Sequence, residues 1–164
     1  MIDIKLLEQL CLYNGISGDE GNVRNLIINE IKDCADDIKT DNLGNLIVFK
    51  KGKKSAKSKL MVSAHMDEVG LMVTDITPDG YLKFDEVGGI DRRVLPGKRV
   101  CVGRNGLNGV IGVKPIHLTN GDEKTAVPKM NDMYIDIGAE SREDALKYVN
   151  YGDGINFEGD FKTV

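Results

Sequence analysis

Residues 63–73 read SAHMDEVGLMV, and this stretch decides how the fold of the chain is interpreted. It continues an apolar run that begins at Leu60 and reads as a strand buried on both faces, as in the centre of an α/β sheet. His65, Asp67 and Glu68 interrupt that run. Because residues i and i+2 of a strand point to the same side, His65 and Asp67 are expected to face one space. That space would lie at the carboxyl end of the strand, where open α/β sheets bind ligands.

Spacing alone leaves two interpretations of His65 open. A lone histidine near a core is commonly a structural side chain with a satisfied partner. The alternative is a metal ligand, because neutral imidazole binds Zn²⁺ or Co²⁺ and a nearby carboxylate fixes its tautomer and raises its basicity. Strand alternation turns Glu68 away, so we expect Glu68 to be a solvent-facing or hinge residue rather than a third ligand.

The composition is that of a globular protein with one ordinary domain or two small ones. The chain has 164 residues, of which 41% are hydrophobic and 29% charged, and its net charge is −4. This balance gives no reason to expect a nucleic-acid partner, and no stretch approaches the roughly 18 apolar residues of a membrane span. The N-terminus lacks the pattern of a signal peptide, so we expect a cytoplasmic protein.

The three cysteines, Cys11, Cys34 and Cys101, are odd in number and far apart. Because no C-x-x-C pair is present, a disulfide scaffold or a thiolate zinc site is disfavoured. We expect buried free thiols, which is the simpler interpretation in a reducing compartment. Cys101 alternates within an expected strand and is predicted to lie in the core.

The pattern of elements changes near residue 68. The first part reads as α/β: a short amphipathic helix around residues 6–12, a second helix opened by the S-x-x-E capping box of residues 17–20, and a strand at residues 45–49. After it, short strands alternate with glycine and proline turns, which predicts a small β sandwich or barrel. One further helix is expected from Ser141 to Tyr148, with Ser141 as its cap.

Three other features favour ordinary structural roles. Residues 50–59 contain six lysines, and we interpret them as a solvated loop rather than a polyanion site. Asp91, Arg92 and Arg93 could recognise a substrate carboxylate, but a solvated loop is the favoured interpretation, because nothing else in the sequence fixes their direction. His117 follows an expected strand, and a structural loop role is favoured for it.

A series of short motifs runs in order over essentially the whole chain. They are TDNLGN at 40–45, AHMDEVG at 64–70, GG at 88–89, GVIGVKPIH at 109–117, DMYIDIG at 132–138 and SREDA at 141–145. In these motifs the chain resembles the tetrahedral aminopeptidases, dinuclear metallopeptidases that are often labelled cellulase M or endoglucanase.

The resemblance implies a fold and two site residues. It implies an α/β/α catalytic domain interrupted by a small β-barrel-like dimerisation domain. Residues 1–68 would be an incomplete N-terminal segment of the catalytic domain, residues 69–160 the inserted β domain, and residues 161–164 the start of the return. By motif match His65 would bind one of two divalent metal ions, Zn or Co. Asp67 would orient His65 and support catalysis.

The resemblance also implies what the chain lacks. The other functional residues of the family lie beyond the small domain, and one histidine with one aspartate cannot hold two metals. We therefore expect an N-terminal half that supplies ligands for at most one metal ion and is inactive alone. The expected partners are a peptide substrate, a homo-oligomer of dimers assembling to a dodecamer, and a missing C-terminal half. A first segment without the rest of its sheet should expose apolar surface and associate.

The function implied is a metal-dependent aminopeptidase that removes N-terminal residues from short peptides through metal-activated water. One alternative is a non-catalytic oligomerisation module. A weaker alternative is an endoglucanase, because its paired carboxylates would need a cleft position that the sequence does not indicate.

Overall fold

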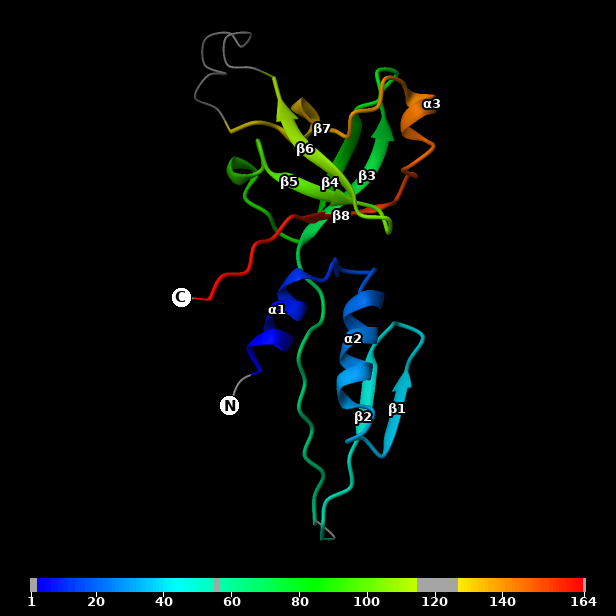
Figure 1. Cartoon of the computed structure of the whole chain (residues 1–164), viewed down its shortest axis with the longest axis vertical. Helices are drawn as coiled ribbons and strands as arrows, with labels where there is room; N and C mark the ends of the chain where they lie inside the picture. Colours follow the sequence, from blue (N-terminus) through cyan, green and yellow to red (C-terminus); the bar gives the residue numbers. More distant parts are fainter. Residues whose placement is uncertain (1–2, 55–56, 115–126, 164) are drawn as a thin grey trace. The chain divides into compact units, whose positions relative to one another are not determined.

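The computed structural model describes residues 3–54, 57–114 and 127–163 of the chain (Figure 1). The chain divides into two compact units, Met1–Asp67 and Glu68–Val164. The first is mixed α/β and the second is a closed β-barrel. The domain roles expected for residues 1–68, 69–160 and 161–164 stay predictions.

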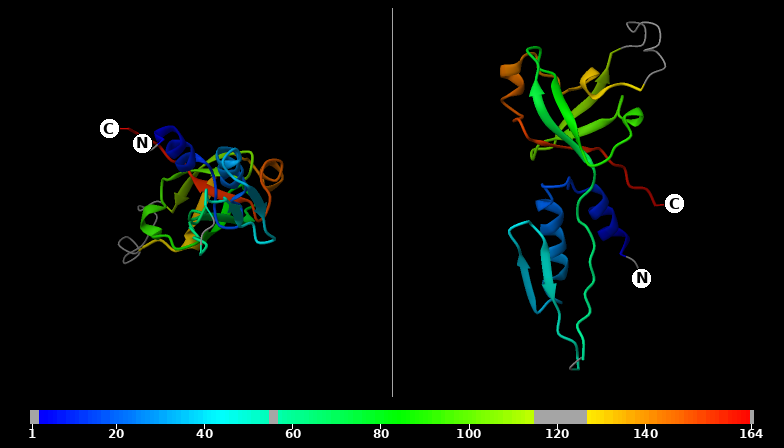
Figure 2. Two further views of the ribbon diagram at one scale, coloured as in Figure 1. Left: turned by 90° about the horizontal axis from the view of Figure 1, so that it is seen from below. Right: turned by 180° about the vertical axis from the view of Figure 1, so that it is seen from behind.

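The first unit consists of two helices and a β-hairpin. Its elements are α1 (Ile4–Leu12), α2 (Gly21–Ile31), β1 (Asp37–Thr40) and β2 (Leu46–Phe49). The strands pair antiparallel, with Thr40 opposite Leu46. Figures 1 and 2 show α2 alongside this hairpin. Arg24 of α2 joins the two, because its Nη1 donates a hydrogen bond to the carbonyl oxygen of Gly44 at 2.9 Å.

The buried strand predicted at residues 60–64 is wrong. The segment from Leu60 to Ala64 has no strand pairing and is exposed, with Leu60, Met61 and Val62 at 91%, 88% and 86% exposure. A central strand is buried by neighbouring strands on its two edges and by layers on its two faces. Among the described residues of this unit the two strands pair only with each other, so the apolar run has nothing to bury it.

The core of the first unit is small. Its buried apolar side chains are Ile16, Val23 and Leu26, and α1 has no buried residue. The strand β2 is exposed along Ile47, Val48 and Phe49. This unit therefore presents much apolar surface for its size.

The second unit is a closed antiparallel barrel of six strands, which confirms the expectation of a mostly β module. The strands follow the order β3-β4-β7-β6-β5-β8 around the barrel. They are β3 (Gly70–Ile76), β4 (Leu82–Val87), β5 (Arg99–Val102), β6 (Leu107–Val113), β7 (Met133–Asp136) and β8 (Gly154–Phe157). Closure pairs each of these described strands with a neighbour on both of its edges.

Alternating side chains from the strands fill the barrel interior. Leu71, Val73, Val100, Ile135 and Ile155 are at most 1% exposed and belong to one continuous cluster. This alternation is the period-2 pattern of a sheet with one buried face. It gives the second unit a core of its own.

Short helical segments connect the strands. They are η1 (Arg92–Val94), η4 (Met130–Asp132) and α3 (Arg142–Ala145). The hydroxyl of Ser141 accepts a hydrogen bond from the backbone N–H of Asp144, which confirms Ser141 as the cap. The helix ends before the predicted Tyr148.

The expected burial of the cysteines is largely wrong. All three are free thiols, but Cys11 and Cys34 are exposed and Cys101 is half-buried. Val100 and Val102 are the buried residues of β5, so strand alternation turns Cys101 outward, where its Sγ lies 3.9 Å from Asn108 Oδ1.

Within the described residues, none of the helices has the length and apolar character needed to span a membrane.

Candidate metal-binding site

His65 and Asp67 lie in contact, as the sequence predicts, although without strand geometry. The Nδ1 atom of His65 is 2.9 Å from the carbonyl oxygen of Asp67 and 3.4 Å from its Oδ1. Both oxygens accept hydrogen bonds, so the partners indicate that Nδ1 carries the proton. The unprotonated Nε2 then keeps its lone pair, and the imidazole is 85% exposed. This is the tautomer that a metal-binding histidine needs.

Ser17 completes the arrangement, and sequence reasoning missed it. Its hydroxyl donates a short hydrogen bond to Oδ2 of Asp67. This contact lowers the pKa of Asp67 below its ordinary value of 3.8, with smaller contributions from the carboxylate's own backbone and from His65. The Asp67 side chain is therefore a carboxylate at neutral pH, held between a serine hydroxyl and an imidazole.

The predicted capping box at Ser17 is wrong, because Ser17 makes the contact with Asp67 instead. The helix α2 begins at Gly21 with Glu20 as its cap residue, and no side chain caps it. The carboxylate of Glu20 accepts from the backbone N–H of Gly18 at 2.7 Å. A motif of four residues carries no sign of a partner fifty positions away, so the sequence offered no signal for this contact.

Gly15 explains how the chain brings Ser17 to this place. A Cβ added at Gly15 would lie 2.7 Å from Cγ2 of Val23 and 3.6 Å from the carbonyl oxygen of Met66. The missing side chain lets the turn pass close to α2 and to the segment before Asp67. Ile16 is buried at 2% exposure and anchors the turn.

The donor set fits one part of a metal site. An exposed Nε2 suits Zn²⁺ or Co²⁺, and the carboxylate beside Nδ1 is the usual orienting partner of a ligating histidine. A group of three or more histidine, cysteine, aspartate or glutamate side chains that could hold an ion is absent from the described residues. The described part of the chain could therefore supply one ligand with a supporting carboxylate, and it contains no closed set of ligands.

The charged residues of the Asp91 loop pair with one another or with a neighbouring strand. Arg93 binds the carboxylate of Asp91 through two nitrogens, and this pairing lowers the pKa of Asp91 to about 2. Arg92 pairs with Glu86 at 3.0 Å. These contacts favour the structural interpretation of the loop.

Glu68 belongs to no group of ligating side chains in the described part of the chain. Glu68 begins the second unit and is exposed, and partial loss of water around its carboxyl raises its pKa. His117 lies outside the described residues. Of the lysine-rich residues 50–59, Lys50 lies 3.7 Å from Asp36 in an exposed ion pair, as in an ordinary solvated loop.

The chain is similar in sequence and fold to proteins named as aminopeptidases. A putative aminopeptidase of Acetivibrio thermocellus is 48% identical over 155 residues, which cover 94% of this chain and 44% of the relative. The TET aminopeptidase of the marine sediment archaeon Thaumarchaeota archaeon SCGC AB-539-E09 superposes with a TM-score of 0.91 at 34% identity, over 98% of this chain and 45% of that one.

A match to a family profile shows the family of the chain. The profile of the M42 glutamyl aminopeptidase family matches residues 44–164. The chain belongs to this family of metallopeptidases, which confirms the resemblance to the tetrahedral aminopeptidases. It spans less than half the length of the relatives it matches.

Two further structures bear on assembly and on naming. PhTET1-12s, a dodecamer, superposes with a TM-score of 0.84 at 44% identity, over 100% of this chain and 48% of that one. A Thermotoga maritima protein called endoglucanase has a TM-score of 0.83 at 44% identity, over 96% and 46% of the two chains. Members of this family thus carry both kinds of name, as the resemblance implied.

Proposed function

We propose that the chain is the N-terminal half of a dinuclear metallo-aminopeptidase that removes N-terminal residues from short peptides. When bound, two divalent ions, Zn or Co, would activate the water that attacks the scissile carbonyl. The described residues supply too few ligands for two metal ions, and we expect the chain alone to be inactive. The observation that carries the proposal is the Ser17–Asp67–His65 arrangement in a member of a metallopeptidase family.

Each of the three side chains has a role of its own. His65 binds one metal ion through Nε2, because its Nδ1 faces the two oxygens of Asp67. Asp67 fixes that tautomer and orientation by facing Nδ1 with its backbone and side-chain oxygens. Ser17 holds Asp67 in the ionised form, since its hydroxyl lowers the pKa of that carboxyl.

The proposal assigns roles to the two units. Residues 1–68 act as the N-terminal segment of a catalytic domain, residues 69–160 as a dimerisation domain, and residues 161–164 as the start of the return. The exposed apolar run at residues 60–62 and the exposed strand β2 fit a segment whose sheet is completed by further chain. That further chain corresponds to the half of the relatives that this sequence does not cover.

The proposed partners are a peptide substrate, a C-terminal half and further copies of the assembled enzyme. PhTET1-12s supports an assembly of dimers into a dodecamer, because it matches this whole chain and is a dodecamer. A closed barrel is a suitable dimerisation element, because its core is formed by side chains of the second unit alone.

A complementation assay tests the proposal. The 164-residue chain is incubated with Co²⁺ or Zn²⁺ and aminoacyl-p-nitroanilides, alone and with the C-terminal part of the Acetivibrio thermocellus relative. We expect turnover only in the mixture. The change His65→Ala should abolish it, whereas His117→Ala, at the only other histidine of the sequence, should leave most of it.

Other outcomes favour the alternatives. A stable complex of the two halves that lacks turnover with either metal would contradict the enzyme and favour a non-catalytic oligomerisation module, which the self-contained barrel also fits. Release of reducing sugar from cellulose would favour the endoglucanase. A glycosidase needs two carboxylates facing one bond, whereas the His65 site offers the single carboxylate of Asp67.

A further inference from the structure

A small hollow on the barrel unit lies apart from His65 in sequence and has no role in the proposed peptidase chemistry. It has a volume of about 200 Å³ and is lined by Leu107, Ile137, Gly138, Ala139, Asp144 and Tyr148. Pockets for drug-sized ligands are larger, roughly 300–1,000 Å³. The hollow is therefore the size of a single side chain or a small amine.

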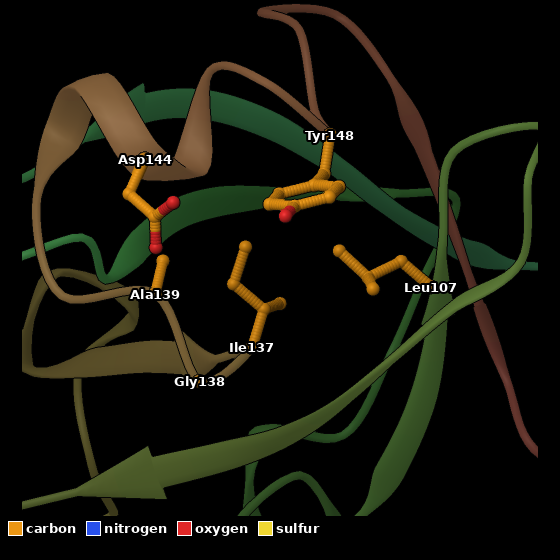
Figure 3. A pocket seen from close by; sticks show the side chains of 6 residues that line it. All are labelled: Leu107, Ile137, Gly138, Ala139, Asp144 and Tyr148. Carbon is orange, nitrogen blue, oxygen red and sulfur yellow. The ribbon is translucent and has the colours of Figure 1, made fainter.

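The lining combines an apolar wall with an aromatic ring. In Figure 3 the ring of Tyr148 lies over the side chains of Ile137 and Leu107, and Ala139 continues the wall beside Asp144. Tyr148 is 56% exposed, so more than half of its surface is open to solvent. An alkyl chain would find apolar contact here, and a cation would be attracted to the ring face.

Asp144 supplies the one charge among the lining residues. Its carboxylate accepts from Lys147 Nζ at 3.1 Å and from the backbone N–H of Glu140 at 3.3 Å. These two contacts lower its pKa, so the group is ionised at neutral pH. A carboxylate has about four acceptor positions, which leaves capacity for another donor.

The neighbourhood also favours a cation over an anion. Residues 136–148 contain the carboxylates of Asp136, Glu140, Glu143 and Asp144 against the cations of Arg142 and Lys147. Lys147 is 65% exposed, and exposed ion pairs of this kind are worth little. An incoming ammonium can therefore share or replace the contact that Lys147 makes.

We propose that this hollow binds a primary alkylammonium group, the chemistry of a lysine side chain. The ammonium would donate to the carboxylate of Asp144, and the alkyl stem would lie between the ring of Tyr148 and the wall formed by Ile137 and Leu107. This proposal does not depend on the peptidase proposal, because it uses no residue of the His65 site.

A titration followed by NMR tests the proposal on the full chain. Methyl resonances of Leu107, Ile137 and Ala139 are recorded as n-butylammonium chloride is added, with 1-butanol as the uncharged probe of similar size. We expect saturable shifts with the amine and none with the alcohol. A second arm uses Nα-acetyl-lysinamide: shifts like those of the amine indicate a lysine side chain as the natural ligand, and their absence indicates a free amine.

Substitutions test separately how the charge of Asp144, the ring of Tyr148 and the competing ammonium of Lys147 contribute to amine binding. Asp144→Asn should weaken binding about tenfold or more, the loss expected for a hydrogen bond to a charged group, whereas Glu143→Gln should change it little. Tyr148→Leu should weaken it and Tyr148→Phe should keep it. Lys147→Gln should strengthen it about two- to fivefold by removing the competitor, a gain that a merely structural role of Asp144 does not explain.

Three results would overturn the proposal. They are equal shifts with 1-butanol and the amine, shifts that never saturate, or binding unaffected by both Asp144→Asn and Lys147→Gln. Because Lys147→Gln leaves the α3 cap of Ser141 in place, that variant keeps the test valid if Asp144→Asn fails to fold.

Discussion

The hydroxyl of Ser17 donates a hydrogen bond to the carboxylate of Asp67, a residue fifty positions further along the chain. The contact joins the turn between α1 and α2 to the end of the segment that carries His65. It also fixes the Oδ2 edge of the carboxylate, while the other edge faces the imidazole. The position and charge of the His65 partner thus depend on a residue outside the H-x-D motif.

The change Ser17→Ala should raise the pKa of Asp67 toward 3.8, because the serine hydroxyl is the largest cause of the lowered value. Carboxyl resonances of labelled aspartate, followed through an acid titration, measure this shift. Ser17→Thr keeps a hydroxyl and should preserve most of the effect. If the pKa of Asp67 is the same in the alanine variant as in the parent chain, Ser17 does not control the ionisation of Asp67.

The same variant makes a prediction about stability against pH. A carboxyl whose pKa is lowered on folding stabilises the folded state above its unfolded pKa of 3.8, and this contribution disappears as the pH falls through the folded pKa. The difference in free energy of unfolding between the parent chain and Ser17→Ala should therefore be constant above about pH 5 and shrink below it. Chemical denaturation at several pH values measures the difference.

The pKa of Asp91 can also be tested by acid titration, and the neighbouring arginine, Arg92, provides a matched control. Arg93 is the main cause of the Asp91 pKa of about 2, through side-chain and backbone hydrogen bonds. Arg93→Gln should raise that pKa toward 3.8, though not fully, because the backbone N–H of residue 93 still donates. Arg92→Gln should not move it, since Arg92 pairs with Glu86. Equal effects of the two variants would contradict the assigned pairing.

The barrel could be predicted from the sequence because its signals are local. The strands Gly70–Ile76 and Arg99–Val102 fit the short strands between turn residues that the sequence predicts after residue 68. Strand β8 (Gly154–Phe157) was not predicted. Its pairing with β3 and β5 depends on residues 50 or more positions away, which leave no trace in its own composition.

The first unit shows the limit of local reasoning. Leu60–Ala64 has the composition of a buried strand, but burial is a property of neighbours, and the described residues supply none. Ser17 has the context of a helix cap, but it takes a distant partner instead. The contact between His65 and Asp67 was predictable, since a spacing of two residues brings the side chains together in any extended backbone.

Gly80 should be intolerant of a side chain for two separate reasons. Its φ is +86°, and a Cβ would lie 2.7 Å from the backbone oxygen of Ala139. Gly152 has a similar φ of +84° but open space around the added Cβ. Gly80→Ala should therefore cost more than Gly152→Ala, by about 1–3 kcal/mol of unfolding free energy, the usual cost of overpacking. Thermal or urea unfolding measures the stability of both variants. Equal losses of stability would mean that the backbone near Ala139 shifts to make room for the added methyl group.

The apolar run at residues 60–62 should be responsible for apolar dye binding and association of the isolated chain. Leu60 and Val62 are 91% and 86% exposed within a continuous apolar stretch, whereas Leu43 is equally exposed but isolated in a hairpin turn. Contiguous exposed apolar patches commonly bind partners, whereas single scattered apolar residues at the surface are normal and need no partner.

The double change Leu60→Thr and Val62→Thr should lower dye fluorescence and increase the monomer fraction measured by light scattering. It should also weaken capture of the C-terminal half of the Acetivibrio thermocellus relative, while Leu43→Thr leaves all three measurements near those of the parent chain. If the double variant associates as strongly as the parent, the partner surface lies elsewhere, with the exposed face of β2 at Ile47 and Phe49 as the next region to change.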